Sequence, residues 1–236
     1  MSKPLQAIIV GAGHRALAYA NYALSHPEQL QIVGVADPTP LRRQQTAEVL
    51  AALPQCADFI INGTMDHQHV PTAIPLLERG YHMLLEKPFA TSEEEMELLV
   101  SVVRQRQSIV SVCHVLRYAP FYAAIRQKVV ESALGDILSV QAVEHVSYHH
   151  MAVGFIRGKW SQIGYCHSPM LMAKSCHDLD LITWMKSGIA PVRVSSAGRF
   201  TFGITWNTSR IQPLKTSSNR CAPAPMDSAC GKQTWT

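Results

Sequence analysis

Lys87 is the residue whose setting in this sequence most suggests proton-transfer chemistry. It stands between Glu86 and Pro88, directly after a predicted strand over residues 81–85. A lysine that is partly desolvated at the end of a parallel strand can exchange a proton with a substrate hydroxyl near neutral pH. A surface lysine paired with Glu86 would occupy the same position. The position alone therefore leaves both interpretations open.

A second candidate group comes from one predicted helix, which contains the run KSCHDLDL at residues 174–181. Lys174, His177 and Asp178 fall on one face of that helix, because residues three and four apart are neighbours. A histidine beside a carboxylate can act as a general base whose ring the acid orients. A single helical histidine is more often a packed or solvated residue, so this alternative stays open.

Other histidines extend the set of candidates. His114 ends a predicted strand beside Arg117 and could line the same cleft, or could equally be buried and satisfied. Further histidines and cysteines raise the question of a metal site: His145, His149, His150, His167, Cys166 and Cys176. They form neither an H-E-x-x-H motif nor a C-x-x-C pair, so we expect no metal site.

A strand, a turn and a helix at the N-terminus must position these groups. Residues 8–15 read IIVGAGHR, and Ala16 completes the pattern G-x-G-x-x-A. Gly11 lets the chain turn sharply out of the strand, Gly13 lets a pyrophosphate approach the backbone, and Ala16 lets the helix pack on the sheet. The phosphates then meet free N–H groups at the positive end of the helix.

An acidic residue follows this fingerprint at the expected place. Residues 31–36 form a second apolar strand, and Asp37 at its end is suited to accept hydrogen bonds from a ribose hydroxyl. A glycine turn with an ordinary surface aspartate is the alternative. Asp37 favours NAD over NADP, because a carboxylate repels a 2'-phosphate, whereas Arg42 and Arg43 keep NADP open.

Alternating elements predict a mostly parallel α/β sheet up to His114. We expect helices over residues 14–25, 41–53, 70–79 and from a capping box at Ser92 and Glu95 to about 107. We expect the later strands over residues 57–62, 81–85 and 108–114.

The pattern changes after Arg117. We expect helices over 121–132 and from Pro169, as the first helical residue, to about 185, and strands over 137–146 and 192–195. Residues 151–165 show no clear period, which is typical of a functional or disordered loop. Beyond Phe202 neither period persists, and we expect an irregular or disordered segment over 203–236.

The composition excludes several classes of protein. The 236 residues are 47% hydrophobic and 16% charged, which is typical of a globular protein. The net charge of +4 is scattered, so we expect no nucleic-acid partner, and no apolar run is long enough to span a membrane. A first strand in place of a signal peptide, and six cysteines without C-x-x-C, predict a cytoplasmic protein.

Over about residues 7–196 these features resemble the Gfo/Idh/MocA family, named from glucose-fructose oxidoreductase and inositol dehydrogenase. The segments that carry the resemblance are GAGHR from Gly11, ADP from Ala36, GTMD-x-x-H from Gly63, GYH from Gly80, EKP from Glu86 and HDLDL from His177. The resemblance implies an N-terminal Rossmann domain and a C-terminal α/β domain whose open sheet often forms an oligomer interface. It also implies NAD(P)-dependent oxidation or reduction of a sugar-like or cyclitol hydroxyl or carbonyl.

The resemblance also implies roles for individual residues. Lys87 becomes the expected catalytic residue, with His177 as its acid/base partner. The expected cofactor-binding residues are Gly11, Gly13, His14, Arg15, Asp37, Thr64, His69, Glu86 and Lys87. The expected substrate-binding residues are His114, Arg117, Lys174 and Asp178.

Three features depart from the family pattern. Many members have an aspartate one turn before the histidine, where this chain has Ala173 followed by Lys174. The segment between Asp37 and Ala57 is short, as if one strand were missing. The resemblance ends after Phe202, so we expect a Rossmann domain over 1–118, an incomplete substrate domain over 119–202 and the tail described above.

These departures keep alternative functions open. Besides a dehydrogenase with a polyol or sugar substrate, the sequence is compatible with a non-catalytic dinucleotide-binding protein or inactive truncated isoform. An NAD-dependent glycosidase, an activity known in the family, is a third reading. We expect a homo-oligomer only if the sheet of the second domain forms.

Overall fold

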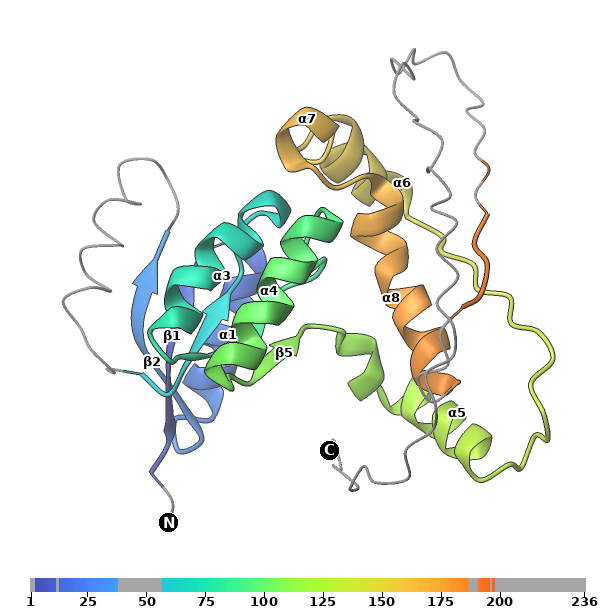
Figure 1. Ribbon diagram of the computed structural model, residues 1–236, viewed down its shortest axis with the longest axis horizontal. Coiled ribbons are helices and arrows are strands. Elements are labelled where there is room, and N and C mark those ends of the chain that lie inside the picture. The colour runs from blue at the N-terminus through green and yellow to red at the C-terminus, as the bar shows by residue number, and fades with distance from the viewer. Residues whose placement is uncertain (1–2, 12, 38–56, 187–190, 196, 198–236) are drawn as a thin grey trace. The chain divides into compact units, whose positions relative to one another are not determined.

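The computed structural model describes residues 3–11, 13–37, 57–186, 191–195 and 197 (Figure 1). The chain divides into two compact units, residues 1–190 and 191–236. The described residues up to 114 form five strands and helices between them. The strands are β1 (Leu5–Val10), β2 (Leu30–Ala36), β3 (Phe59–Asn62), β4 (His82–Leu85) and β5 (Val110–Val112). The helices are α1 (His14–Ser25), the 3-10 helix η1 (Asp66–Gln68), α3 (His69–Glu78) and α4 (Glu93–Arg106).

All five strands are parallel and lie in the order β2-β1-β3-β4-β5. The chain runs from β1 outward to β2 on one side, and β3 then pairs with the other side of β1. The strand order therefore reverses at β1, and ligands of open α/β sheets bind beyond the carboxyl ends of the strands at such a point. The predicted Rossmann-type sheet is confirmed, and it fixes where a ligand site is expected.

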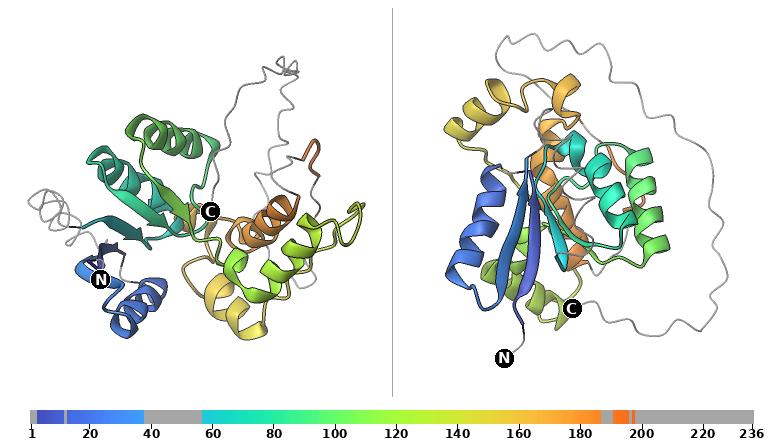
Figure 2. Two further views of the ribbon diagram at one scale, coloured as in Figure 1. Left: turned by 90° about the horizontal axis from the view of Figure 1, so that it is seen from below. Right: turned by 90° about the vertical axis from the view of Figure 1, so that its left-hand side faces the viewer.

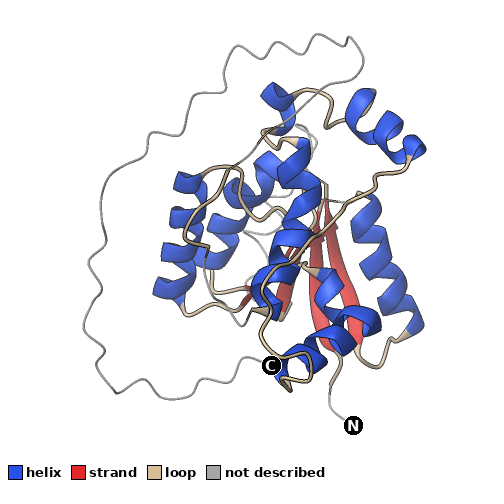
Figure 3. Cartoon of the chain, turned by 90° about the vertical axis from the view of Figure 1, so that its right-hand side faces the viewer, coloured by secondary structure: helices blue, strands red, loops and turns tan. Residues whose placement is uncertain are grey.

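Helices cover both faces of the sheet, with α1 on one face and α3 and α4 on the other (Figures 2 and 3). Successive side chains of a strand point to opposite faces. Ile8 and Val10 accordingly enter the core under α3 and α4, whereas Ala7 and Ile9 pack toward α1 together with Ala16. This division explains why β1 is apolar at every position from 7 to 10, since it is buried on both faces.

Backbone hydrogen bonds continue across the carboxyl edge of the sheet beyond the strands themselves. Each joins the residue after one strand to the last residues of its neighbour: Gly11 N to Ala36 O at 2.6 Å, Gly63 N to Val10 O at 2.8 Å, Glu86 N to Asn62 O at 3.0 Å and Cys113 N to Leu85 O at 2.8 Å. The loops that carry the candidate residues are therefore held in register with one another before any side chain contributes.

Most element boundaries in this part agree with the sequence. Helix α1 begins and ends at the predicted residues, and Gly80 follows α3 with a φ of +86°, the left-handed conformation expected of a C-terminal glycine. The capping box at α4 is only half formed. Ser92 Oγ accepts a hydrogen bond from Glu95 N, but the Glu95 carboxylate accepts from the backbone and hydroxyl of Thr91.

Helices make up the regular structure that is described after β5. They are η2 (Val115–Tyr118), α5 (Pro120–Val130), α6 (Tyr148–His150), the π-helix η3 (Met151–Ile156), α7 (Ile163–Cys166) and α8 (Met170–Met185). Arg117 on η2 donates two hydrogen bonds to Asp180 on α8, and the Arg126 guanidinium of α5 lies 4.7 Å from the ring centroid of Trp184 on α8. Helix α8 is thereby fixed against η2 and α5. None of the described helices is long and apolar enough to cross a membrane.

The strand predicted over residues 137–146 is wrong. This segment has no regular structure, and Leu138, Val140 and Val143 are exposed, with Leu138 at 95%. A strand of an open sheet requires a hydrogen-bonded neighbour, and none of the described residues after β5 belongs to a strand. The alternating apolar residues are typical of a strand, but the described residues include no neighbouring strand with which this segment could pair.

Other predictions beyond residue 150 also need correction. Residues 192–195, which lie in the second unit, are not a strand, and Val192 and Val194 are exposed. Residues 151–165 contain η3 and the first three residues of α7, and only residues 157–162 between them lack helical structure. Pro169 caps α8 and is not its first residue. The helix predicted over 41–53 and the tail over 203–236 lie outside the described residues.

Candidate functional site

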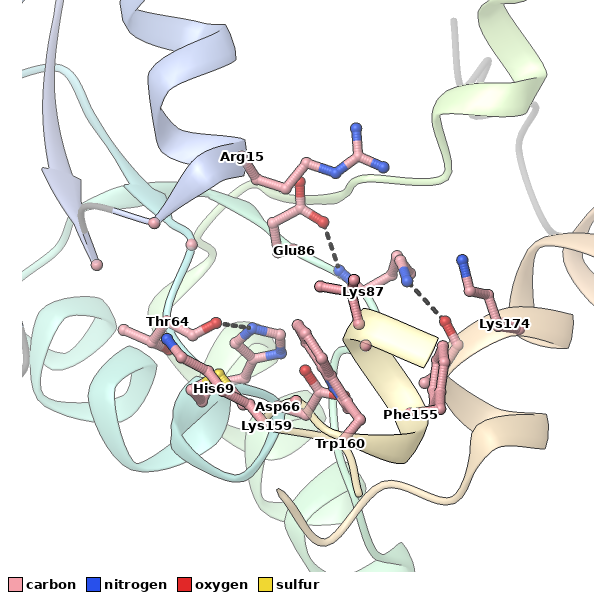
Figure 4. Close-up of a pocket in the computed structure, with 18 of the residues that line it drawn as sticks. Arg15, Thr64, Asp66, His69, Glu86, Lys87, Phe155, Lys159, Trp160 and Lys174 are labelled. Carbon is pink, nitrogen blue, oxygen red and sulfur yellow. Dashed lines mark hydrogen bonds between the residues drawn. The ribbon is translucent and has the colours of Figure 1, made fainter. Parts of the chain in front are cut away.

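A cavity of about 670 Å³ lies at the carboxyl edge of the sheet (Figure 4). Nine of the expected site residues line it: Gly11, Gly13, Arg15, Asp37, Thr64, His69, Glu86, Lys87 and Lys174. The opposite wall comes from η3, the segment after it and α8. Residues 158–160 and Val153, Gly154, Phe155 and Ala173 belong to that wall. The fingerprint turn and Lys87 thus line the same cavity, although several strands and helices separate them in the sequence.

The two fingerprint glycines are required for different reasons. Gly11 has a φ of +87°, and a Cβ placed on it would lie 2.7 Å from backbone atoms of Gly63 and Thr64. Gly13 has an extended backbone, and a Cβ there would meet only Gly63 O, at 3.9 Å. The protein itself therefore excludes a side chain at residue 11, whereas at residue 13 there is open space beside the cavity.

The residues at this turn fit the diphosphate of a dinucleotide. Gly13 is the N-cap of α1 and offers no side-chain acceptor to the first N–H groups of the helix, and the first turn contains no acidic residue. Those N–H groups and the helix dipole favour an anion. Arg15 lines the cavity near this end, and His14 is the first residue of α1. Asp37 lines the cavity after β2, at the place expected for a ribose-binding carboxylate.

His69 joins the loop after β3 to the loop after β4. Its side chain is buried, with Nε2 3.0 Å from Thr64 O and Nδ1 2.7 Å from Pro88 O. Carbonyl oxygens only accept hydrogen bonds, so the imidazole ring is the donor. The ring nitrogen that carries the proton decides whether Thr64 O or Pro88 O accepts. The contact with Pro88 fixes the backbone directly after Lys87, across a cis Lys87–Pro88 peptide bond. His69 thus positions the loop that holds the candidate catalytic lysine.

Asn62, the last residue of β3, is a site-organising residue that the sequence reasoning missed. It is fully buried, and its Oδ1 accepts hydrogen bonds from the backbone and the hydroxyl of Thr64. Its Nδ2 donates to His69 O and to Thr72 Oγ1. A polar residue that ends an otherwise apolar strand was the available signal, because a buried amide requires partners.

Glu86 and Lys87 have distinct partners. The buried Glu86 carboxylate accepts from Tyr19 Oη at 2.8 Å and from the backbone N of Lys87 at 3.2 Å. Tyr19 Oη also lies 3.0 Å from the sulfur of Cys113, whose pKa burial raises to about 12. Lys87 Nζ donates to the backbone oxygen of Ala173 at 2.7 Å. Glu86 is therefore not the ion-pair partner of Lys87, and the interpretation of Lys87 as a surface lysine paired with Glu86 is wrong.

The opposite wall is tied to the sheet by a contact between residues 94 positions apart in the sequence. Trp160 Nε1 donates to the buried Asp66 carboxylate of η1 at 3.0 Å. Both residues line the cavity, together with Phe155 of η3. The π-helix is an uncommon geometry that is frequent at functional sites. Sequence reasoning missed Asp66, Phe155 and Trp160 as cavity residues.

His177, expected beside Lys87, does not line the cavity. Its ring packs edge-on against His114, with 5.9 Å between the ring centroids, and its buried Nδ1 has no hydrogen-bond partner among the described residues. His114 Nε2 in turn lies 3.7 Å from the Asp180 carboxylate that binds Arg117. Burial and the nearby positive charge of Lys87 lower the pKa of His177 to about 4. The ring is therefore neutral at neutral pH.

Asp178, Arg117 and His114 likewise lie outside the cavity lining. Arg117 and His114 face Asp180, a residue that the sequence reasoning had not selected. Lys174 and His177, which helical spacing predicts on one face of α8, therefore have different surroundings. Lys174 lines the cavity, whereas His177 packs between α8 and the end of β5. Among the described residues, no group of three histidine, cysteine or acidic side chains could hold a metal ion.

The lowered pKa of His177 predicts a dependence of stability on pH. An unfolded histidine has a pKa near 6.5, above the folded value of about 4. The contribution of His177 to stability is therefore complete above pH 6.5 and is lost as the pH falls toward 4. Allowing for solvent screening of the half-buried ring, we expect a loss of about 1 kcal/mol between pH 7 and pH 5.

The matched variant for this prediction is His177→Gln, which removes the titrating group. Burial also lowers the pKa of His67, His114 and His150, so the parent protein carries a background with the same sign. Melting temperatures are measured at pH 7 and at pH 5. The decrease in melting temperature from pH 7 to pH 5 is expected to be smaller in His177→Gln than in the parent. Equal falls in both proteins would show that His177 does not change its protonation on unfolding.

Comparison with known proteins supports the interpretation of the fold. Residues 5–114 match the model of the Gfo/Idh/MocA family, described as "Oxidoreductase family, NAD-binding Rossmann fold". The chain is 24% identical over 198 residues to UDP-N-acetylglucosamine 3-dehydrogenase of Acidithiobacillus ferrooxidans, a match that covers 80% of this chain and 56% of that protein. It is 23% identical over 198 residues to inositol 2-dehydrogenase of Corynebacterium glutamicum, covering 78% of this chain and 55% of that protein.

A solved structure has the same fold. The WlbA dehydrogenase from Bordetella pertussis, in complex with NADH and UDP-GlcNAcA, superposes with a TM-score of 0.64 at 20% identity, covering 78% of this chain and 56% of that one. The chain thus spans about half the length of these relatives, 55% to 56%. The motifs, the parallel sheet and the matched family model agree, and residues 5–114 therefore have the NAD-binding Rossmann fold that the model of the Gfo/Idh/MocA oxidoreductase family describes.

Proposed function

We propose that this chain is a nicotinamide-dependent oxidoreductase that transfers a hydride between NAD(P) and a hydroxyl or carbonyl group of a sugar-like or cyclitol substrate. One observation carries the proposal: a single cavity is lined by the fingerprint glycines, by Asp37 and by Lys87. This arrangement has room for a dinucleotide at the switch point of the sheet and brings a proton-exchanging group to the same space.

In this proposal the cofactor is held by groups at the edge of the sheet. Gly11 forms the turn, Gly13 and the N-terminus of α1 receive the diphosphate, and Arg15 adds a positive charge. Asp37 receives the adenosine ribose, and its carboxylate favours NAD over NADP by repelling a 2'-phosphate. His14, Thr64, His69 and Glu86 complete the proposed cofactor set.

Lys87 is the proposed catalytic residue. A bound nicotinamide would supply the hydride acceptor or donor. Lys87 exchanges the proton of the reacting hydroxyl, while the Ala173 carbonyl holds its amine at the cavity. The neutral His177, whose ring packs against His114 and whose Nδ1 has no hydrogen-bond partner among the described residues, is the second proposed site for that proton. His114, Arg117 and Asp178 are proposed to support the substrate side through this packing and not through the cavity lining.

The substrate class receives support from the relatives. Two of them are named for dehydrogenation of UDP-N-acetylglucosamine and of inositol. A domain boundary near residue 118 remains a prediction, as does a homo-oligomer if the sheet of the second domain forms.

A turnover screen tests the proposed function. Purified chain is mixed with NAD or NADP and a panel of sugars and cyclitols, and reduction is followed by nicotinamide absorbance. We expect NAD-linked turnover with at least one polyol.

Two observations favour a non-catalytic dinucleotide-binding protein instead: Ala173 occupies the place of the family's usual aspartate, and His177 lies outside the cavity lining. Saturable cofactor binding without turnover of any polyol would support that second function, and glycoside cleavage without net reduction would indicate a glycosidase.

A further inference from the structure

The charged groups that line the cavity are unevenly compensated. Four cationic side chains line it: Arg15, Lys87, Lys159 and Lys174. Three acidic side chains also line it: Asp37, Asp66 and Glu86. Two of these acids are committed to other partners, because Asp66 accepts from Trp160 and Glu86 accepts from Tyr19 and from the backbone of Lys87. Asp37 lies at the end of β2, in the proposed ribose site.

Lys174 is the cation that α8 contributes to the cavity. It projects from α8 toward the space beside Lys87 (Figure 4), and its Nζ lies 5.7 Å from the ring centroid of the buried Phe155. Within the part of the chain that the structure describes, it forms no ion pair. A half-buried ammonium group that lacks a carboxylate partner is costly unless a ligand supplies the negative charge.

The electrostatic environment of this region points the same way. Burial and the charge of Lys87 lower the pKa of Lys174, and Glu144 offsets this by less than Lys87 contributes. The pKa of His150, which also lines the cavity, is lowered by burial and then by Lys174 and Lys87. Lys87, Lys174 and His150, which come from three different segments of the chain, thus disfavour one another's positive charge at the cavity.

We propose that the substrate carries an anionic group, a carboxylate or a phosphate, and that Lys174 binds it. This inference rests on the proposed function and narrows its substrate class to acidic or phosphorylated sugars and cyclitols. Arg15 and the N-terminus of α1 are assigned to the cofactor diphosphate and Lys87 to the reacting hydroxyl, which leaves Lys159 and Lys174 for a second, non-reacting group. Of these two, Lys174 is the one that lies beside Lys87 (Figure 4), and the charge of Lys87 acts on it. An ammonium group beside an aromatic wall is the kind of isolated charged contact that orients a ligand in a largely apolar pocket.

Binding measurements on the full chain test this assignment. With NADH at saturation, isothermal titration is performed with three probes of the same ring that differ at one carbon: D-glucose, D-glucuronate and D-glucose 6-phosphate. We expect at least one anionic probe to bind about tenfold or more tightly than glucose, because charge-assisted hydrogen bonds are about twice as strong as neutral ones. The tighter of the two probes identifies the group as carboxylate or phosphate.

Three variants separate the role of Lys174 from other effects. Lys174→Met should reduce the preference for the anionic probe to about twofold or less, whereas Lys174→Arg keeps the positive charge and should retain most of it. Lys128→Met, on the exposed face of α5, is the matched surface control and should behave as the parent. Affinity for NADH should be the same in all four proteins.

Several results would overturn the assignment. The first is that the parent binds the neutral and anionic probes equally well, or binds none of them. The second is that Lys174→Met keeps the parental preference for the anionic probe. A loss of NADH affinity in Lys174→Met would assign this lysine to the cofactor instead. Failure of the parent to bind NADH would instead refute the proposed function, so the two failures are distinguishable.

Discussion

Replacement of Lys87 by methionine is expected to lower turnover of the best polyol by about 10²–10⁴-fold, the usual contribution of a positioned general acid or base. Methionine preserves much of the length of the side chain but cannot exchange a proton. The lost hydrogen bond to Ala173 O should destabilise the fold by only about 1 kcal/mol. The measurement is kcat for NAD reduction, accompanied by a melting curve.

Lys87→Arg distinguishes proton transfer from electrostatic stabilisation at this position. Arginine keeps the positive charge and cannot be deprotonated in proteins. If Lys87 exchanges a proton, the arginine variant should be nearly as slow as Lys87→Met. Turnover near the parental rate in Lys87→Arg would contradict the proposed role and would leave only a charge requirement. Lys128→Met controls for removal of a lysine elsewhere.

The second large effect is expected at the fingerprint turn, where two alanine substitutions should fail in different ways. Gly11→Ala combines a φ of +87° with a Cβ that would lie 2.7 Å from the backbone of Gly63 and Thr64. The left-handed conformation alone costs about 1–2 kcal/mol, and displacement of packed backbone adds a similar amount. We expect a loss of about 3 kcal/mol or more in the free energy of unfolding, measured by denaturant titration.

Gly13→Ala is the matched control for this prediction. Its Cβ meets nothing closer than Gly63 O at 3.9 Å, and its extended backbone suits any residue. Stability should therefore change by less than about 0.5 kcal/mol. The added methyl group would lie where the diphosphate is proposed to approach, and crowding of about 1–3 kcal/mol corresponds to about 5–150-fold weaker cofactor binding. Equal stability losses in the two variants would contradict this separation.

The parallel sheet could be predicted from the sequence because its signals are local and agree with one another. The run that ends in Gly11 and Gly13, the strand that ends in Asp37 and the capped helix at Ser92 each mark their own boundaries. Parallel strands place their carboxyl ends at one edge, so the clustering of the cofactor-side residues followed from topology.

The substrate side could not be predicted in the same way because its contacts are non-local. Asp66 and Trp160 are 94 positions apart, and nothing in either segment indicates that they meet. Helical spacing placed Lys174 and His177 on one face, but it could not show that His114 would pack against His177 and divide that face. The apolar alternation over 137–146 is a true local pattern, yet a strand also depends on a neighbour that local pattern cannot reveal.

Titration of the full chain with NADH, followed by nicotinamide fluorescence, tests most directly whether the cavity at the sheet edge holds a dinucleotide. The proposal predicts saturable binding of one NADH per chain, which Gly13→Ala weakens by about 5–150-fold while its melting temperature stays at the parental value. Absence of saturable binding by the parent, or identical binding curves for the parent and Gly13→Ala, would contradict it.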